Sequence, residues 1–425
     1  MIEFLTAQAA IDWVNGARWK GEKNGLENTR ALLQALGHPE TRMGRVIHVA
    51  GTNGKGSTCA LIDAGLRACG FRTGLFTSPY LCRFHERIRV DGVPISDDDL
   101  ISVASRVRAA AEKLAEEGVK CTTFELLTAM ACLHYAERRV DFSVMEVGMG
   151  GRLDSTNVLS PEVSVIAAIG MDHMARLGNT PGEIAAEKAG IIKPETPAVV
   201  LSQDADVMAV FRERAREMRA PLFETAEYEI IESDAYGCTF AAELPAAGLV
   251  RQTISLPGAH QAANACLALT ALDRLNLDMS RAGEGVSRAK WPGRLEWVGN
   301  VLIDGAHNPQ GARALKTYAE AHLKDRRVVL LTGMMQDKQH ALCADIFSSF
   351  ADEIVTTSVS WPRALGAFKL AEDYHGRAVS EASVPAALSR ARRMAGEDGA
   401  IVVAGSIYLA GDVRRLLLPD DDGRI

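Results

Sequence analysis

The chain has 425 residues, of which 47% are hydrophobic and 24% are charged, a composition typical of a soluble globular protein with two or three domains. Its net charge of −7 argues against an extended nucleic-acid surface, and no apolar run approaches the ~18 residues of a membrane helix. The eight cysteines form no CxxC pair and the N-terminus lacks signal-peptide character, so we expect a cytoplasmic protein without nucleic-acid or membrane partners.

The first predicted elements are two helices within residues 1–40, separated by Lys20–Asn24, and a buried parallel strand at Val46–Ala50. The strand runs into the turn GTNGKGS (51–57), and a helical pattern begins at Thr58. A strand, a glycine-rich turn and a helix start together form a phosphate cradle, because free backbone N–H groups and the helix dipole attract anions.

This cradle supplies candidate ligands for ATP and Mg²⁺. Lys55 adds a cation, and Ser57 or Thr58 offers a hydroxyl to the metal. The match to GxxxxGK[ST] is imperfect, since Gly56 stands where a serine or threonine is expected. An ordinary glycine-rich turn is the alternative, although a lysine among three glycines has few structural uses. The predicted nucleotide-binding residues of the turn are Thr52, Asn53, Gly54, Lys55, Gly56, Ser57 and Thr58.

Strands and helices then alternate, which predicts an α/β fold with a doubly wound, mainly parallel sheet. The expected strands are Phe71–Ser78, Asp141–Val147, Val163–Ile169 and Ala198–Leu201, and the expected helices are residues 96–117, 122–136 and 184–190. Short runs between Tyr228 and Leu256 predict antiparallel strands, and His260–Leu272 predicts a helix.

A break at Trp291–Arg294 separates this region from a fresh strand–helix alternation. We therefore predict two domains, residues 1–296 and a smaller α/β domain, residues 297–425. The run Asp420–Asp422 is predicted to be a solvated tail.

Three polar residues of the first domain are candidates for metal chemistry. Glu146 ends a predicted buried strand, where a carboxylate is costly without a cation, so metal binding is favoured over a buried ion pair. His173 follows the next strand, although a lone histidine there is more often a hydrogen-bonded core residue. Lys188 lies in a predicted helix, and its alternative role is an ion pair with Glu187 or another acid.

Eight motifs follow one another over residues 40–412. They are the glycine turn, Ser78-Pro79, MEVGMGGRLDSTN, Asp172-His173 before Leu177-Gly178, AAEKAGIIK, the helix of Asn264, PGR and IDGAHNP. In this order they resemble the folylpolyglutamate synthase/dihydrofolate synthase family, a branch of the Mur-type ATP-dependent amide ligases. The resemblance implies an N-terminal P-loop ATPase domain, a C-terminal Rossmann-like domain and an active site between them.

The implied reaction joins L-glutamate to a folate-type carboxylate, which is tetrahydrofolate polyglutamate, dihydropteroate or both, through an acyl phosphate. ATP becomes ADP and phosphate. The resemblance also implies two Mg²⁺ ions, a carbamylated Lys188 and a monomer, and it leaves a monovalent cation as a further candidate cofactor. The implied metal ligands are Ser57, Ser78, Glu146, His173 and Lys188.

The remaining nucleotide contacts implied by the resemblance are Asn264, Arg294, Asp304 and His307. Lys55, Lys188, Arg294 and His307 form the expected catalytic set, in which Arg294 and His307 neutralise phosphate charge on domain closure. A linker salt bridge is the alternative for Arg294.

The acceptor site is expected at Thr123, Phe124, Glu125, Arg152 and Asp154, and Ser406, helped by Lys338, is expected near the incoming glutamate. Phe124 could equally be an ordinary core aromatic. Tyr80 replaces a histidine found in many members, and Ala175 and Arg176 stand where an acid often lies, which leaves the choice of acceptor open.

Two other functions remain as alternatives. One is a Mur-type ligase acting on a UDP-linked peptidoglycan precursor, but the ~45 residues before the turn are too few for the additional domain such enzymes usually carry. The other is a nucleotide switch, but an NKxD base-reading motif is absent and the second domain would have no purpose.

Overall fold

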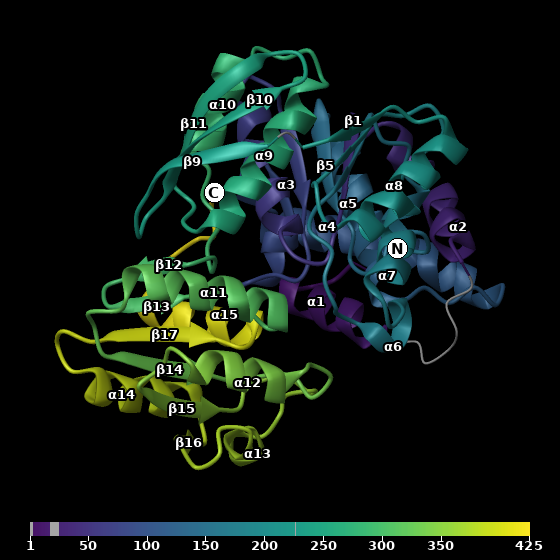
Figure 1. Ribbon diagram of the computed structural model, residues 1–425. Coiled ribbons are helices and arrows are strands. Elements are labelled where there is room, and N and C mark those ends of the chain that lie inside the picture. Colours follow the sequence, from purple (N-terminus) through teal and green to yellow (C-terminus); the bar gives the residue numbers. More distant parts are fainter. Residues whose placement is uncertain (1–2, 18–24, 226) are drawn as a thin grey trace.

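The computed structural model describes residues 3–17, 25–225 and 227–425. The chain folds into a larger N-terminal body that contains two sheets and a smaller C-terminal body that contains one (Figure 1). The predicted helix break at Lys20–Asn24 lies outside the described residues. Across those described, every helix is too short or too polar to traverse a lipid bilayer.

The main sheet has eight strands in the order β4-β3-β2-β5-β1-β6-β7-β8. The six strands from β2 to β8 in this order are parallel, which confirms the prediction, and β3 and β4 add an antiparallel edge. Their bounds are β1 (Arg45–Ala50), β2 (Thr73–Phe76), β3 (Ile88–Val90), β4 (Val93–Pro94), β5 (Phe142–Glu146), β6 (Val163–Ile166), β7 (Ala198–Val200) and β8 (Leu222–Glu224).

Helices cover both faces of this sheet, as a doubly wound fold requires. The predicted helix starts near Ser96 and Thr122 are confirmed, because both hydroxyls accept a hydrogen bond from the first helical turn. The helices before β9 are α1 (Ala7–Gly16), α2 (Glu27–Ala35), α3 (Lys55–Ala68), α4 (Asp97–Glu116), α5 (Thr123–Arg138), α6 (Met174–Leu177), α7 (Pro181–Ala189) and α8 (Ala205–Met218), with 3₁₀ turns η1 (Pro39–Thr41), η2 (Phe84–Arg87) and η3 (Ser155–Val158).

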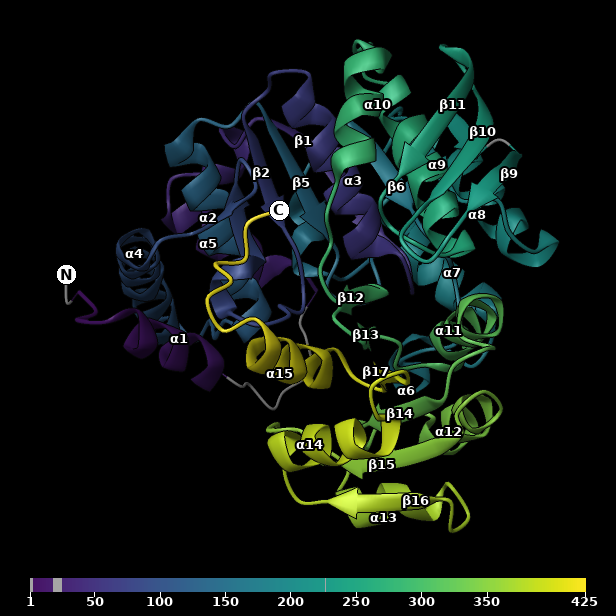
Figure 2. The ribbon, with the colours of Figure 1, turned by 90° about the vertical axis from the view of Figure 1, so that its left-hand side faces the viewer.

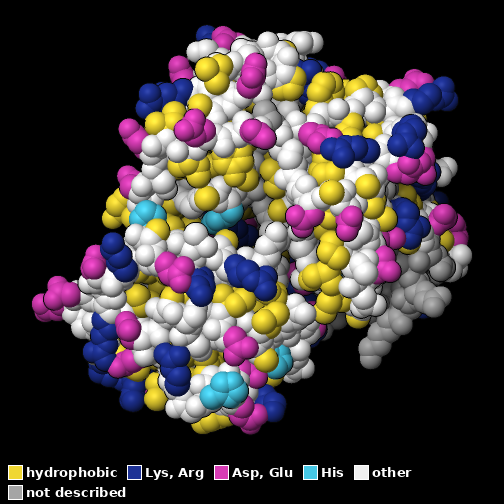
Figure 3. All heavy atoms as spheres, viewed as in Figure 1, with side chains coloured by type: hydrophobic (Ala, Val, Ile, Leu, Met, Phe, Trp, Pro, Cys, Tyr) yellow, Lys and Arg dark blue, Asp and Glu magenta, His cyan; other side chains and the backbone are white. Residues whose placement is uncertain are grey.

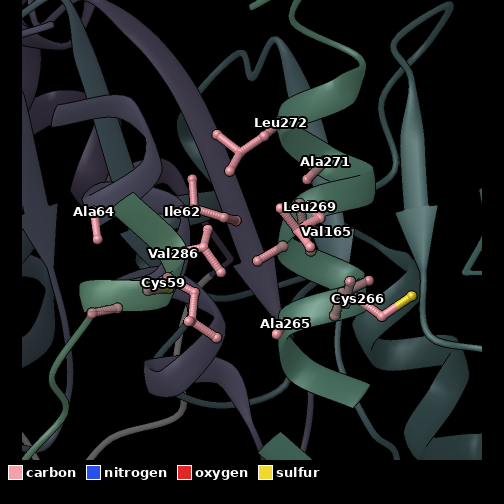
Figure 4. Packing of buried hydrophobic residues seen from close by; sticks show 14 of the residues in the cluster. Cys59, Ile62, Ala64, Val165, Ala265, Cys266, Leu269, Ala271, Leu272 and Val286 are labelled. Carbon is pink, nitrogen blue, oxygen red and sulfur yellow. The ribbon is translucent and has the colours of Figure 1, made fainter. Parts of the chain in front are cut away.

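The predicted antiparallel region is a three-stranded sheet of β9 (Tyr228–Ser233), β10 (Cys238–Leu244) and β11 (Gly248–Ile254). Helices α9 (Ala259–Asp273) and α10 (Met279–Arg288) join it to α3. Small and branched side chains such as Ile62, Ala265 and Val286 interdigitate where these three helices meet (Figure 4). This packing fixes the helix that follows the phosphate turn.

The C-terminal body is a six-stranded sheet in the order β12-β13-β17-β14-β15-β16, parallel except for β12. Its strands are β12 (Glu296–Val298), β13 (Val301–Ile303), β14 (Val328–Thr332), β15 (Glu353–Thr357), β16 (Ala378–Glu381) and β17 (Ala400–Ala404). Its helices are α11 (Pro309–His322), α12 (His340–Ser348), α13 (Ala367–Glu372), α14 (Val384–Ala395) and α15 (Ile407–Leu417).

Three sequence-based expectations need correction. Helix α3 begins at Lys55 rather than at Thr58, and the strand expected at Phe71–Ser78 is limited to β2. The tail after α15 is not free, because Asp421 pairs with Arg414 at 2.5 Å and the segment runs back onto the N-terminal body (Figure 2).

Candidate active site

The phosphate turn lies at the carboxyl end of β1, directly before α3. Gly54 caps the helix with a φ of +86°, and a Cβ atom at this position would lie 2.2 Å from Oδ1 of Asn264. Only glycine allows this backbone conformation and this approach of α9. The N–H groups of Lys55, Gly56 and Ser57 therefore form the open first turn of α3, which is suited to a phosphate.

A cleft of about 270 Å³ opens between this turn and the C-terminal body. Figure 3 shows the molecule hollowed where the two bodies meet, with histidine and basic side chains nearby. Fourteen of the predicted nucleotide and metal residues line this cleft, and they are Thr52, Asn53, Gly54, Lys55, Gly56, Ser57, Ser78, Glu146, His173, Lys188, Asn264, Arg294, Asp304 and His307. The structure thus brings together residues that are up to 255 positions apart in the chain.

Thr58 is the predicted nucleotide or metal residue that does not line the cleft. Its side chain is fully buried, and its hydroxyl has no hydrogen-bond partner in the described part of the chain. Ser57, by contrast, is one of the residues that line the cleft. Of the two hydroxyls that the sequence left open, Ser57 is therefore the one placed to reach a metal ion.

Glu146 ends β5 and is almost entirely buried. Its Oε2 accepts a hydrogen bond from the backbone N–H of Ser78 at 2.8 Å. Burial raises the pKa of this carboxyl, while the charge of Lys55 and the Ser78 hydrogen bond oppose that shift. A buried carboxylate with a single backbone donor has free acceptor capacity, which suits it to a cation.

Lys188 is also buried, at the end of α7, and among the described residues it forms no ion pair, although the charges of Asp172, Asp154 and Glu187 act on it from a distance. The predicted alternative, an ion pair with Glu187, is wrong because Glu187 binds the Arg152 guanidinium at 2.8 Å. Burial and, to a smaller extent, the nearby charge of Lys55 together lower the pKa of Lys188 to about 7. A substantial fraction of this amine is therefore neutral near pH 7, the form that can react with CO₂.

Asp172 connects the two bodies of the protein. Its carboxylate lies 2.7 Å from Nζ of Lys338 and 3.5 Å from Nε2 of His307. Burial alone would raise the pKa of Asp172, but the hydrogen bond with His307 and the charge of Lys338 hold it well below its usual range. Asn53 adds a second bridge, with its Nδ2 2.6 Å from Oε1 of Gln310.

His173 occupies the loop end next to Asp172, with a φ of +52°. Burial lowers the pKa of His173 to about 4, so its imidazole is neutral at pH 7 and has a lone pair available for a metal. In the described residues, no three histidine, cysteine, aspartate or glutamate side chains are close enough to hold a metal by themselves. An ion in the cleft would therefore depend on serine hydroxyls, phosphate oxygens and water as well.

Arg294 and Asp304 lie between the two bodies. Burial lowers the pKa of Arg294, and the charges of Asp304 and Glu146 counteract this shift. Asp304 accepts hydrogen bonds from the backbone N–H groups of Leu295 and Ala306 at 2.9 and 2.8 Å. Asp304 thus fixes the loop that carries Arg294. The Arg294 guanidinium donates to the carbonyl of Gly293 at 2.9 Å, and no linker salt bridge of Arg294 is formed among the described residues.

The predicted acceptor residues lie outside the cleft, and most have roles in the fold. Glu125 caps α5 through the N–H of Thr122, and Thr123 donates to the carbonyl of Val14. Asp154 accepts hydrogen bonds from Met149 N and from Thr156, and Arg152 is committed to Glu187. The expected pairing of Asp154 with a pterin edge therefore has no support from this geometry.

Phe124 and Ser406 remain compatible with substrate contacts. The Phe124 ring packs on Phe76 at 5.8 Å and lies beneath Gly148, where a Cβ atom would come within 2.5 Å of the ring. Ser406 caps α15 by accepting a hydrogen bond from the N–H of Tyr408. Their roles at the acceptor and at glutamate stay predictions.

Sequence reasoning gave no role to four cleft or bridging residues. Asp172 directly precedes His173 in the sequence, and Asn308 and Gln310 stand at the start of a predicted helix. His260 at the start of α9 also lines the cleft. Their position at strand ends and helix starts was a usable signal, because these are the ligand-binding points of open α/β sheets.

Replacing Asp172 with asparagine is expected to lower the free energy of unfolding by about 3 kcal/mol, because it leaves the ammonium of Lys338 buried without a counter-charge. The double variant Asp172→Asn/Lys338→Met should recover much of this loss. Urea denaturation measures both. Glu224→Gln, which breaks the exposed pair with Arg212, is the control and should cost less than about 1 kcal/mol. If the losses in free energy of unfolding from the two single substitutions simply add in the double variant, Asp172 and Lys338 do not stabilise each other and the prediction is wrong.

A phosphate turn that faces a second α/β body across a cleft of acids, histidine and lysine defines a nucleotide-dependent ligase. Comparison with protein families also indicates a ligase. Residues 49–272 match the Mur ligase middle domain, and residues 293–407 match the glutamate ligase domain of Mur ligases.

Comparison with individual proteins identifies the family within this class of ligases. The chain is 36% identical to dihydrofolate synthase/folylpolyglutamate synthase of Bacillus subtilis over 97% of this chain and 100% of that protein. It is 34% identical to folylpolyglutamate synthase of Lacticaseibacillus casei over 91% and 93%. Mycobacterium tuberculosis folylpolyglutamate synthase complexed with ADP superimposes with a TM-score of 0.90 at 32% identity, over 97% of this chain and 98% of that chain.

The chain therefore belongs to the folylpolyglutamate synthase/dihydrofolate synthase family and is an ATP-dependent ligase. This confirms the family predicted from the motif order. It also favours the folate reading over a ligase of peptidoglycan precursors.

Proposed function

We propose that this enzyme transfers the γ-phosphoryl group of ATP to the carboxylate of a pteroate or folyl acceptor and then joins the resulting acyl phosphate to the amine of L-glutamate. A carboxylate resists attack by an amine because oxide is a poor leaving group. Phosphorylation replaces oxide with phosphate. The products are an amide, ADP and phosphate.

The observation that carries this proposal is the charge arrangement around one cleft. Lys55 and Arg294 line the cleft from the turn and from the linker, and His307 lines it from the C-terminal body, while Lys338 pairs with Asp172 at its wall. Phosphoryl transfer concentrates anionic oxygens at one point, so it is favoured by cations fixed around that point. A cleft between two bodies also allows water to be excluded when they close.

Different residues of the cleft bind the phosphates and neutralise the developing charge. The first turn of α3 binds phosphate through its N–H groups, and Lys55 adds a positive charge beside them. Arg294 and His307 are placed to neutralise charge that develops on the transferred group. Asp172 orients His307 and Lys338 by holding both across the gap between the bodies.

Magnesium fits this site because a buried carboxylate with spare acceptor capacity, a serine hydroxyl and a neutral imidazole meet at the cleft. Ser57, Ser78, Glu146 and His173 would hold two ions, with carbamylated Lys188 as a further oxygen donor. When bound, Mg²⁺ supplies positive charge to phosphate oxygens. A monovalent cation is a further candidate that no residue specifically requires.

Isotope transfer tests the proposed intermediate. Enzyme supplied with ATP, L-glutamate and an acceptor whose carboxylate carries ¹⁸O is expected to release phosphate containing one ¹⁸O atom, because the acceptor oxygen leaves with the phosphoryl group. Mass spectrometry of the phosphate measures this. Turnover that releases only unlabelled phosphate would rule out the acyl phosphate. Parallel assays with dihydropteroate and tetrahydrofolate identify the acceptor.

Several finer assignments belong to the same proposal. The predicted domains, residues 1–296 and 297–425, agree within one residue with the segment between helix α10 and β12, the first strand of the smaller sheet, which begins at Glu296. We also expect a monomer that works in the cytoplasm on small-molecule substrates. Size-exclusion chromatography with light scattering tests the monomer.

A further inference from the structure

The side chain of Asn53, in the phosphate turn, is bonded to the C-terminal body. The two N–H donors of its amide go to Oδ1 of Asn308 at 3.2 Å and to Oε1 of Gln310 at 2.6 Å. Its Oδ1 accepts a hydrogen bond from Nδ2 of Asn308 at 2.9 Å. Phosphate oxygens only accept hydrogen bonds, so an amide must donate in order to bind them. In this arrangement the side chain of Asn53 has no donor left for a nucleotide phosphate.

Backbone partners at both ends fix the orientation of these three amides. Oδ1 of Asn308 accepts from the backbone N–H of Gly311 at 2.9 Å, as the cap of α11, so the atom of Asn53 that faces it must be a donor. Nε2 of Gln310 donates to the backbone carbonyl of Ile169 at 3.3 Å, so its Oε1 is the atom that accepts from Asn53. A flip of any one amide would bring two donors or two acceptors together. We call Asn53, Asn308 and Gln310 the amide clasp.

A glycine makes room for the amide clasp. A Cβ atom on Gly170 would lie 2.3 Å from Oε1 of Gln310, so this amide can occupy its position only because residue 170 has no side chain. Gly170 belongs to the loop after β6, and its carbonyl accepts from Oγ1 of Thr52 in the phosphate turn at 3.1 Å. The phosphate turn, the loop after β6 and the start of α11 therefore meet at one point.

The amide clasp lies beside two groups of the proposed reaction. Asn53 precedes Lys55 by two residues, and Asn308 directly follows His307. Lys55 and His307 both line the cleft, one from each body. Phosphoryl transfer requires such groups to be placed accurately, because a displacement of about 1 Å can cost about 100-fold in rate. Neutral amides suit this task, since their hydrogen bonds are individually weak and can break when the bodies separate to exchange substrates.

We propose that the amide clasp forms when the C-terminal body closes on the phosphate turn, and that it then positions His307 relative to Lys55. Asn53, Asn308 and Gln310 are positioning residues, which act through Lys55 and His307 and do not touch the substrates with their side chains. This inference rests on the proposed function, which gives Lys55 and His307 their roles at the transferred phosphate.

A double-mutant cycle tests the amide clasp. Asn53→Ala and Gln310→Ala should each lower kcat about 10- to 100-fold, and the double variant should lose no more than the larger single loss, because either substitution already opens the clasp. The Kd of a non-hydrolysable ATP analogue, measured by calorimetry, should stay within about threefold of the unmodified value in all three variants. If Asn53→Ala alone weakens analogue binding and the two losses in kcat multiply, Asn53 binds phosphate and the proposal is wrong.

Gly170→Ala tests the same contact and leaves every amide of the clasp in place. The added methyl group displaces the flexible end of Gln310, so kcat should fall about 10- to 100-fold, as in Gln310→Ala, with analogue binding unchanged. Asn300→Ala is the matched control, because Nδ2 of Asn300 donates to the carbonyl of Gly399 within the C-terminal body. This control should keep kcat within about twofold of the unmodified enzyme.

Hydrogen exchange measures the coupling between the bodies without turnover. Gln310→Ala should speed exchange of the backbone amides in residues 51–57, and Asn53→Ala should speed exchange in residues 307–313, since each substitution releases a segment of the other body. Exchange that rises only beside the substituted residue, or a loss of kcat that merely follows a lower melting temperature, would overturn the proposal. If the unmodified enzyme binds the analogue but ligates no glutamate, the proposed function fails, and the reciprocal exchange still decides whether the clasp couples the two bodies.

Discussion

Arg294→Ala is expected to lower kcat about 10³-fold while the Kd for ATP changes by less than about fivefold. The reason is that the guanidinium lines the cleft at the linker between the two bodies, where the charges of Asp304 and Glu146 act on it. The glycine turn keeps its phosphate contacts in the variant, so ground-state binding is retained. The charge that opposes the developing negative charge is lost. Single-turnover rates and ATP titration measure the two quantities separately.

Two further variants make this test decisive. Arg294→Lys keeps one positive charge and should recover part of kcat. Arg288→Ala removes an exposed guanidinium that lies 3.7 Å from Glu284 and should leave both kcat and Kd unchanged. Equal losses in ATP affinity and kcat for Arg294→Ala would contradict a role limited to the transition state.

The parts of the site that could be predicted from sequence are those fixed by local backbone chemistry. A run of branched apolar residues such as Val46–Ala50 predicts a buried strand, and a glycine-rich turn before a helix predicts a phosphate site regardless of the rest of the chain. Glu146 ends one predicted parallel strand and His173 follows another, and the carboxyl ends of such strands meet at one edge of a sheet, although the metal role of His173 comes from the family resemblance rather than from its position.

The parts that were missed depend on partners distant in sequence. Asp172 and Lys338 are 166 residues apart, and only the packing of the two bodies brings them together. The partner of Glu187 is Arg152, which no local pattern at Lys188 indicates. Glu125 differs, because Thr122 and Glu125 have the spacing of a helix capping box, a local signal that predicts a role in the helix start rather than in substrate binding.

Lys188→Met is expected to stabilise the protein and to abolish most of its activity. Folding lowers the pKa of Lys188 from 10.5 to about 7, so the folded state binds this proton less tightly than the unfolded state. The resulting penalty on stability is fully present below pH 7, shrinks as the pH rises from 7 to 10.5, and is absent above 10.5. Methionine removes the penalty at similar volume.

The free energy of unfolding of Lys188→Met should therefore exceed that of the unmodified protein by a few kcal/mol at pH 7, since one pKa unit corresponds to about 1.4 kcal/mol, and by little above pH 10. Urea denaturation in EDTA and CO₂-free buffer measures this difference. If Lys188→Met stabilises the protein equally at every pH, the gain in free energy of unfolding does not come from removing a buried charge.

Activity should change in the opposite direction. The neutral amine of Lys188 can add CO₂ and release a proton, which converts a cationic side chain into an oxygen donor beside Glu146 and Ser57. Methionine cannot undergo this reaction, so kcat should fall by at least about 100-fold. The same burial that destabilises the ammonium form makes the amine reactive, which explains why a destabilising lysine is useful here.

Carbon-13 NMR with labelled bicarbonate distinguishes this role from simple charge loss. A carbamate signal is expected in the unmodified protein and in Lys193→Met, and it should be missing in Lys188→Met. Burial lowers the pKa of Lys193 to about 8, but its Nζ donates to the carbonyl of Asn157 at 2.7 Å and it lies outside the cleft, so it is a matched control. An active, bicarbonate-supplied enzyme with an unmodified Lys188 amine would show that the lysine acts as a cation, and that the metal ions rely on Glu146, His173 and the serine hydroxyls alone.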